Sequence, residues 1–109
     1  MKLLLLSRHE MTPVQTEAFP GAEVTTINHA WQATADDAAD IAANAATWRK
    51  FAGMADVIAG VFPPVAIEAI PADLPAMIAT PVSAQTQSIR ADGEKKIEFS
   101  HVRWAWIKR

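Results

Sequence analysis

The sequence contains no cysteine, which excludes disulfide bonds and thiolate chemistry. Long apolar runs are missing as well. The four leucines after Lys2 are too few for the hydrophobic region of a signal peptide, and Arg8-His9-Glu10 interrupts them. No stretch of the chain approaches the length of a membrane span. We therefore expect a soluble, cytoplasmic protein that has no membrane partner.

Several ligand-binding motifs are also missing. Neither the phosphate-loop pattern nor the glycine-rich dinucleotide fingerprint occurs. The three histidines are isolated and lack metal-ligand spacing, and no serine has the glycine frame of a nucleophile elbow. We therefore predict no metal and no cofactor. The remaining backbone amides, hydroxyls, arginine and histidines suit a ligand rich in phosphate and ribose better than an acyl substrate.

The net charge and the length of the chain limit the expected partners and the number of domains. The formal net charge is only −2, so the surface as a whole is not basic and duplex nucleic acid is not an expected partner. The chain of 109 residues, half of them apolar, has the size of a single domain. Basic residues do gather near its end, where an anionic ligand could use them: Lys95, Lys96, Arg103, Lys108 and Arg109.

Strands and helices alternate over the first eighty residues. Residues 2–7 are an apolar run that ends in a polar group, which is typical of a central parallel strand buried on both faces. Further strands are predicted over 23–28, 56–61 and 77–80, and helices over 12–19, 34–53 and 64–70. This alternation favours an α/β fold, with residues 1–83 as a minimal, mostly parallel, Rossmann-like sheet with right-handed crossovers.

The helix over 34–53 has the strongest end signals. Thr34 is expected as its N-cap, in a capping box with Asp37, and Gly53 as its stop. The stripe predicted to pack on the sheet consists of Ala38, Ile41, Ala45, Trp48 and Ala52. Near the end of the next strand, Gly60 would let another backbone or a ligand approach closely.

Residues 84–109 read as a C-terminal β-hairpin. Asp92-Gly93 is a turn dipeptide between extended runs over 85–91 and 94–106. The apolar alternation changes phase between Phe99 and Val102, which predicts a bulge or sharp twist near Ser100-His101. His101 and Arg103 lie two apart, so we expect them on one face, either as a basic pair for an anion or as part of a solvated surface.

Ser7, Arg8 and His9 follow the first strand directly. Ligands of open α/β sheets sit beyond the carboxyl ends of such strands. Histidine titrates near neutrality and suits general acid/base work, and a guanidinium matches two phosphate oxygens. The alternatives are a helix-capping or solvent-facing loop histidine for His9, and an arginine paired with Glu10 for Arg8.

Further candidates are expected on the same rim. Thr12 and Gln15 lie at the start of the first helix, where Thr12 also suits a structural cap. His29 follows the second strand, and it shares the rim with His9 if the two strands are parallel. Thr80 and Ser83 follow the fourth strand and either line the pocket or are ordinary loop hydroxyls.

Two stretches together resemble a known family. Residues 6–15 contain the segment His9-x-x-Thr12-x-x-Gln15 directly after a strand, and residues 78–104 run through the Asp92-Gly93 turn into Phe99-Ser100-His101-Val102-Arg103-Trp104. Both are similar to the ends of small CRISPR-associated Rossmann-like proteins, a group that includes ring nucleases. One departure is that Phe62-Pro63-Pro64 stands where that group has a glycine-rich loop.

The resemblance implies a homodimer that cleaves a cyclic oligoadenylate, most simply cyclic tetra-adenylate, and so switches off type III CRISPR signalling. Cleavage in this group is commonly metal-independent: the ribose 2′-hydroxyl attacks the adjacent phosphorus. Ser7 and Arg8 would grip the phosphate, His9 would assist proton transfer, and Thr12, Gln15 and Thr80 would hold ribose and base. The other assigned ligand contacts are His29, Phe62, Ser83 and Arg103.

Two other classes of function stay open. The protein could bind a cyclic nucleotide without cleaving it. Alternatively, it could be a small interaction protein whose Trp104 and Trp106 surface docks on a partner without any ligand.

Overall fold

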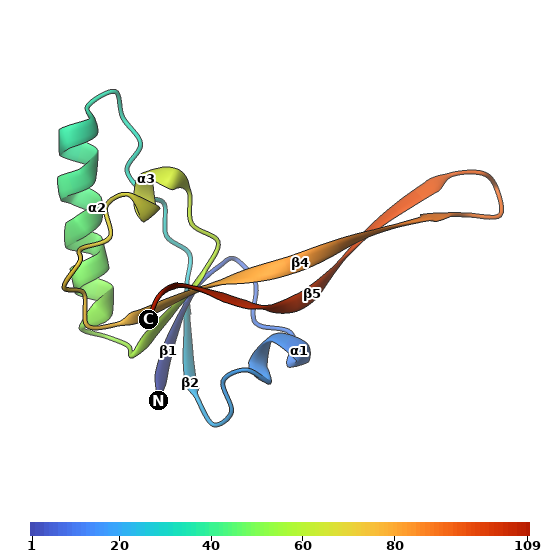
Figure 1. The fold of residues 1–109 in the computed structure, drawn as a ribbon, viewed down its shortest axis with the longest axis horizontal. Helices are drawn as coiled ribbons and strands as arrows, with labels where there is room; N and C mark the ends of the chain where they lie inside the picture. The colour runs from blue at the N-terminus through green and yellow to red at the C-terminus, as the bar shows by residue number, and fades with distance from the viewer.

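The computed structural model describes residues 1–109 as a single five-stranded sheet with three helices (Figure 1). The strands are β1 (Lys2–Leu6), β2 (Glu23–Ile27), β3 (Val57–Gly60), β4 (Met77–Ile89) and β5 (Lys95–Lys108). The helices are α1 (Pro13–Thr16), α2 (Asp37–Ala52) and α3 (Pro64–Ile67). The strand order is β2-β1-β3-β4-β5, and only β5 is antiparallel. The predicted small α/β fold with a C-terminal hairpin is confirmed. None of the helices combines the length and apolar character needed to traverse a bilayer.

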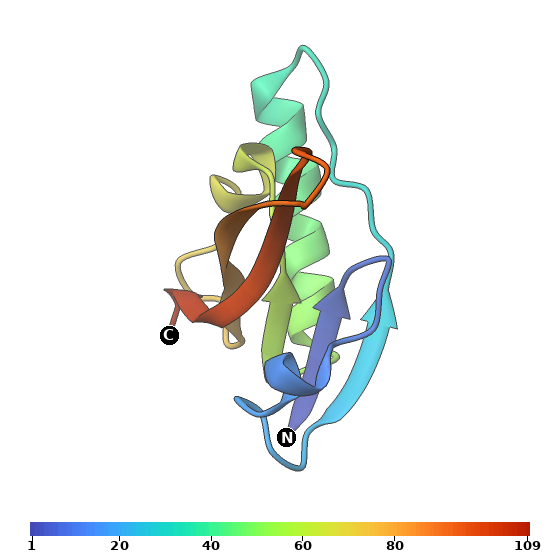
Figure 2. The same ribbon diagram turned by 90° about the vertical axis from the view of Figure 1, so that its right-hand side faces the viewer.

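Strand β1 is an interior strand, paired in parallel with β2 on one side and β3 on the other. Its leucines alternate between two cores: Leu4 and Leu6 face α2 and α3, whereas Leu3 and Leu5 face Phe19. Figure 2 shows α2 behind the sheet, with α1 and the hairpin in front of it. Burial on both faces therefore explains the uninterrupted apolar run. The prediction that this strand is the central one is wrong: the strand order makes β3 central and places β1 second from one edge.

The N-terminal end of α2 and its buried face differ from the sequence prediction. Its N-cap is Asp36, whose carboxylate accepts a hydrogen bond from the amide of Ala39 at 3.1 Å. Thr34 is not the cap, because its amide and hydroxyl both donate to Asp40, each at 2.7 Å. The predicted apolar stripe is confirmed only towards the C-terminal end of the helix, where Trp48 is buried and Ala52 packs on the core. Towards the N-terminal end it is wrong: Ile41 is 42% exposed, and the other buried positions are Asp40, Asn44 and Phe51.

Polar groups on α2 are buried because they bind backbone that is not part of the sheet. The side chain of Asn44 accepts from the amide of Gln32 at 2.9 Å and donates to the carbonyls of Gln32 and Val65. One turn later, the indole of Trp48 donates to the carbonyl of Ala66 at 2.8 Å. Buried polar groups are retained in folded proteins when they are paired in this way. Helix α2 thus holds both the segment between β2 and α2 and the helix α3.

The two short helices end earlier than predicted. Helix α1 ends at Thr16, and the chain then turns so that Phe19 enters the core under Leu3 and Leu5. Helix α3 ends at Ile67, where i to i−3 hydrogen bonds continue the chain as tighter turns up to Ile70.

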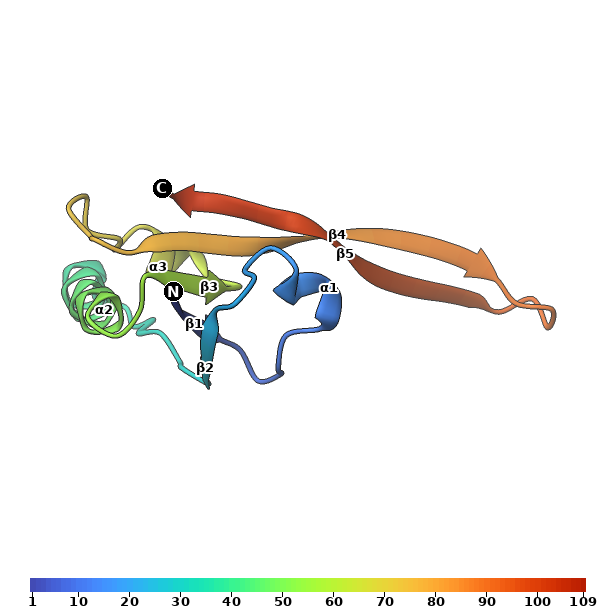
Figure 3. The same ribbon diagram turned by 90° about the horizontal axis from the view of Figure 1, so that it is seen from below.

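The hairpin is longer than the sequence predicted. Strand β4 runs without interruption from residue 77 to 89, so the two strands predicted over 77–80 and 85–91 are one. Pro81 is tolerated within it because the pairing of β3 with β4 ends at Ala79. The turn at Asp92-Gly93 is confirmed, with Gly93 at a φ of +85°. The outer part of the hairpin, which no longer pairs with β3, leaves the body as a twisted ribbon (Figures 1 and 3).

The predicted bulge in the second strand of the hairpin is confirmed. Val82 pairs with Arg103 and Ser83 pairs with His101, so Val102 is the extra residue. A second irregularity, which the sequence did not reveal, places Ile107 between the pairs Ile78–Lys108 and Ala79–Trp106. Each extra residue reverses the face on which the side chains that follow it lie.

Asn44→Ala is expected to lower the free energy of unfolding by about 1–3 kcal/mol, because it removes three partly buried hydrogen bonds to the backbone of Gln32 and Val65. Urea denaturation followed by tryptophan fluorescence measures this. Thr47→Ala is the matched control on the same helix. Its hydroxyl bonds only to the helix carbonyl of Ala43, and its loss should change stability by no more than about 0.5 kcal/mol. Equal losses in both variants would contradict this role of Asn44.

Candidate functional site

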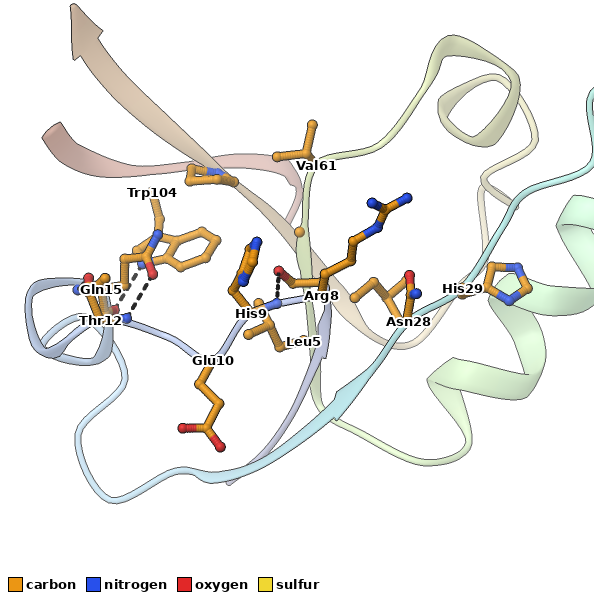
Figure 4. A pocket seen from close by; sticks show the side chains of 14 residues that line it. Leu5, Arg8, His9, Glu10, Thr12, Gln15, Asn28, His29, Val61 and Trp104 are labelled. Carbon is orange, nitrogen blue, oxygen red and sulfur yellow. Dashed lines mark hydrogen bonds between the residues drawn. The ribbon is translucent and has the colours of Figure 1, made fainter. Parts of the chain in front are cut away.

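A cavity of about 600 Å³ opens at the carboxyl ends of β1 and β3 (Figure 4). The chain leaves β1 towards α1 on one face of the sheet and leaves β3 towards α3 on the other. Diverging connections of this kind create the crevice in which open α/β sheets bind ligands. The cavity is lined by residues 5–10 together with Thr12, Gln15, Asn28, His29, Gly60, Val61, Pro81 and Trp104.

Gly60 allows the ends of β1 and β3 to approach each other closely. A Cβ atom at this position would lie 2.7 Å from the carbonyl oxygen of Leu6, closer than a Cβ atom tolerates. The close backbone approach predicted for Gly60 is therefore confirmed, and the approaching backbone is that of β1.

The segment that follows β1 is held by two hydrogen bonds. The amide of Ser7 donates to the carbonyl of Ile27 at 3.1 Å, which extends the pairing with β2 by one residue. The hydroxyl of Ser7 accepts from the amide of His9 at 3.1 Å, forming a tight turn. This turn places Ser7, Arg8 and His9 on one cavity wall, as the sequence predicted.

Arg8 has no acidic partner. The two ion pairs of the chain join Arg49 to Asp73 and Lys96 to Glu98, and neither involves this wall. In Figure 4 the carboxylate of Glu10 is directed away from the guanidinium of Arg8. The alternative in which Arg8 pairs with Glu10 is therefore not what the structure shows. A solvent-accessible guanidinium remains available to an anion.

Thr12 and Gln15 form the second wall at the start of α1. Each accepts from the other's backbone: Gln15 Oε1 from the amide of Thr12 at 3.0 Å, and the Thr12 hydroxyl from the amide of Gln15 at 3.3 Å. This capping box confirms the structural role of Thr12. The Nε2 group of Gln15 and the hydroxyl hydrogen of Thr12 remain free to donate to a ligand.

Trp104 is a cavity residue that sequence reasoning assigned elsewhere. Its indole N–H donates to the carbonyl of Gln15 at 3.0 Å, and its ring packs edge-to-face on Phe19 at 5.5 Å. The residue therefore joins β5 to α1 and supplies an aromatic wall. It is half-buried within the fold, whereas Trp106, the other residue of the predicted docking surface, is 36% exposed.

His29 lies on the cavity rim but is directed away from His9 in Figure 4. Its ring packs edge-to-face on Trp31 at 4.9 Å and on Phe51 at 5.2 Å. This burial, together with the positive charge of Lys50, lowers the pKa of His29 below its usual 6.5. The parallel pairing of β1 with β2 brings both histidines to one rim, yet the ring of His29 belongs to an aromatic cluster.

Four predicted ligand contacts do not line the cavity: Phe62, Thr80, Ser83 and Arg103. Phe62 is 7% exposed and packs on Trp48 at 5.1 Å, so it is a core residue. Ser83 lies outward of the bulge on the exposed hairpin. Pro81 lines the cavity, and successive side chains of a strand point to opposite faces of the sheet. The side chain of Thr80 therefore points away from the cavity.

The bulge also separates His101 from Arg103. They pair with Ser83 and Val82 respectively, which are adjacent in β4 and point to opposite faces. The basic pair expected from their spacing is therefore absent. His101 instead packs on Trp104 with ring centroids 5.4 Å apart, and its Nδ1 is buried without a hydrogen-bond partner.

Asn28, Val61, Pro81 and Trp104 complete the cavity and were not predicted to line it. The first two directly follow β2 and β3, so the rule that placed Ser7 at a strand end also identifies them. Pro81 and Trp104 are a cross-strand pair, and only their register in the hairpin brings them to the site.

No three His, Cys, Asp or Glu side chains are grouped so that they could hold a metal ion. Comparisons with protein-family models, with curated proteins and with solved structures found no match to this chain.

The folding stability should depend on pH through His29. Because the folded state lowers the pKa of His29, the unfolded chain takes up a proton first as the pH falls below about 6.5. The midpoint of thermal unfolding should therefore decrease between pH 7 and pH 5. His29→Gln should remove part of this slope, whereas His9→Gln, at an exposed position, should keep it. If the unfolding midpoint of His29→Gln fell with pH as steeply as that of the native protein, His29 would not be the source of this pH dependence.

Proposed function

We propose that this protein is a ring nuclease, which binds a cyclic oligoadenylate in the cavity at the ends of β1 and β3 and cleaves it. The observation that carries the proposal is the guanidinium of Arg8, which has no acidic partner and lies beside Ser7 and His9 on one cavity wall. An unpaired guanidinium with neighbouring hydroxyl and imidazole donors suits a phosphodiester anion.

The remaining walls fit the other parts of a nucleotide. Asn28 and Gln15 offer amide groups for ribose hydroxyls or base edges, and the half-buried indole of Trp104 offers an apolar surface for a base. The cavity of about 600 Å³ has the volume typical of small-ligand sites.

The proposed reaction needs alignment more than a protein nucleophile. The ribose 2′-oxygen forms a bond to the adjacent phosphorus and loses its proton to solvent, while the bond from phosphorus to the 5′-oxygen breaks. Arg8 and the hydroxyl of Ser7 stabilise the charge that develops on the phosphoryl oxygens, and protonated His9 donates a proton to the departing 5′-oxygen. The products are linear oligoadenylates that end in a 2′,3′-cyclic phosphate.

The resemblance of residues 6–15 and 78–104 to small CRISPR-associated proteins supports the same proposal. In that setting the protein would act as a homodimer in the cytoplasm and would end signalling by the cyclic messenger. A symmetric ring ligand fits a two-fold dimer, since each subunit would contact equivalent phosphates.

The direct test is incubation of the purified protein with cyclic tetra-adenylate in EDTA, followed by chromatography and mass spectrometry. We expect linear products with cyclic phosphate ends. His9→Ala should slow cleavage about 10²–10⁴-fold with little change in affinity, as for loss of a general acid. Arg8→Ala should weaken both binding and cleavage, and Arg8→Lys should restore part of the binding.

Arg90→Ala is the charge-matched control. Arg90 follows the last residue of β4 at the turn of the hairpin, away from the cavity, so its loss should leave cleavage unchanged. A ring in which every 2′-hydroxyl is replaced by hydrogen should bind but stay intact. Unchanged cyclic tetra-adenylate after prolonged incubation with the native protein would overturn the enzymatic proposal.

Binding without cleavage is the second candidate. The observation that favours it is that no side chain orients the imidazole of His9: the residue bonds to Ser7 through its backbone amide, and its ring makes no hydrogen bond. In this case cyclic tetra-adenylate would raise the thermal unfolding temperature of both the native protein and His9→Ala, and the ligand would be recovered intact.

A further inference from the structure

A second cavity, of about 460 Å³, adjoins the cavity at the ends of β1 and β3, which we now call the first cavity. The two share five lining residues, among them Arg8 and Val61. Val61 is 76% exposed, so no side chain closes the passage over it. Trp31 and Pro63 line the second cavity alone, and Trp104 lines the first but not the second. The two cavities are therefore neighbouring parts of one surface, and Arg8 belongs to both.

The walls that the cavities do not share belong to opposite faces of the sheet. Trp31 packs on the core that contains Trp48 of α2, whereas Trp104 packs on the core that contains Phe19. In Figure 4, Trp104 and His29 lie on opposite sides of Arg8. Arg8 follows β1 at the carboxyl edge of the sheet, where the two faces meet. A ligand that fills both cavities must therefore cross this edge at Arg8.

The second cavity has an aromatic wall of fixed geometry. The rings of Trp31 and His29 meet edge-to-face with centroids 4.9 Å apart, and both residues are half-buried. Behind Trp31 lies the fully buried ring of Trp48, at a centroid distance of 4.7 Å. Flat rings held in this way are stacking surfaces for a nucleobase, whatever its identity.

The polar groups of the second cavity suit the edge of a neutral base next to an anion. Burial and the positive charge of Lys50 lower the pKa of His29 below 6.5. Its ring is therefore neutral at pH 7 and offers one donor and one acceptor. The amide of Asn28 offers both as well. Arg8 is the only charged residue in the lining, so negative charge of the ligand is expected at Arg8.

We propose that the site binds two consecutive nucleotides of a single strand, with the phosphate between them on Arg8, one base on Trp104 and the other on Trp31. The second base site rests on the proposed function, since it takes the ligand to be a nucleotide. Stacked neighbouring bases lie about 3.4 Å apart, too close to occupy opposite faces of a sheet. The two bound bases are therefore unstacked, and the smallest complete ligand is a linear dinucleotide.

Calorimetric titration with the deoxydinucleotide d(ApA) tests the second base site. This probe has no 2′-hydroxyl next to its phosphate, so the protein can bind it but cannot cleave it. Two analogues, each with one adenine replaced by a tetrahydrofuran spacer, keep the phosphate and its charge. Each should bind about 5- to 150-fold more weakly than d(ApA), as expected for the loss of one stacked base. Equal affinity of d(ApA) and either analogue would overturn the second base site.

Pro63→Asp changes the second cavity alone. Pro63 is the N-cap of α3, a position that favours Asp, so the helix should be retained. An entering base would have to desolvate the new carboxylate. Pro64→Asp is the matched control, because it adds the same charge one residue later and outside both cavities. Pro63→Asp should weaken d(ApA) binding at least 5-fold more than Pro64→Asp does. Equal affinities of the two variants for d(ApA) would contradict the proposal.

The indole N–H signals in NMR spectra locate the bases and separate this proposal from the proposed function. d(ApA) should shift the signals of Trp31 and Trp104, whereas Trp106, which lines neither cavity, should shift least. A shift of Trp104 without Trp31 would overturn the second base site and leave the proposed function standing. Shifts of both, with cyclic tetra-adenylate left intact, would overturn cleavage and retain the second base site. No binding of d(ApA) at millimolar concentration would overturn both.

Discussion

The parallel pairing of β1 with both β2 and β3 is the constraint on which the candidate site depends. Parallel strands end at the same edge of a sheet, so the residues that follow them meet there. The carbonyl of Leu6 approaches Gly60 so closely that no side chain fits between the strands. Because the connections then diverge to opposite faces, the space between them remains open. Ser7, Arg8 and His9 line this space as a consequence of backbone geometry.

The body of the protein is held together by polar contacts as much as by apolar ones. Asp40 and Asn44 are buried on α2, where they satisfy the backbone of the extended segment that follows β2. That segment carries Trp31, whose ring lies 4.7 Å from Trp48. It also carries His29, which is thereby drawn into the aromatic cluster and away from His9. The packing of α2 therefore decides which histidine faces the cavity.

The base and the outer part of the hairpin have different surroundings. Its base supplies Trp104 and Pro81 to the cavity, while its outer part exposes Ile97 and Phe99. The bulge at Val102 separates these two parts and reverses the side-chain alternation along β5.

The sequence by itself determined the order of strands and helices, the turn at Asp92-Gly93, the bulge in the final strand and the first cavity wall. These features depend on local patterns: apolar runs, turn residues and the position of polar groups at a strand end. Register and packing were decided only by the tertiary structure. The N-terminal half of the buried face of α2 was mispredicted because Asp40 and Asn44 look like solvent-facing residues until the backbone they bind is known. Phe62 entered the core and Arg103 turned away from His101 for the same reason: the face on which a side chain lies depends on partners that are distant in the sequence.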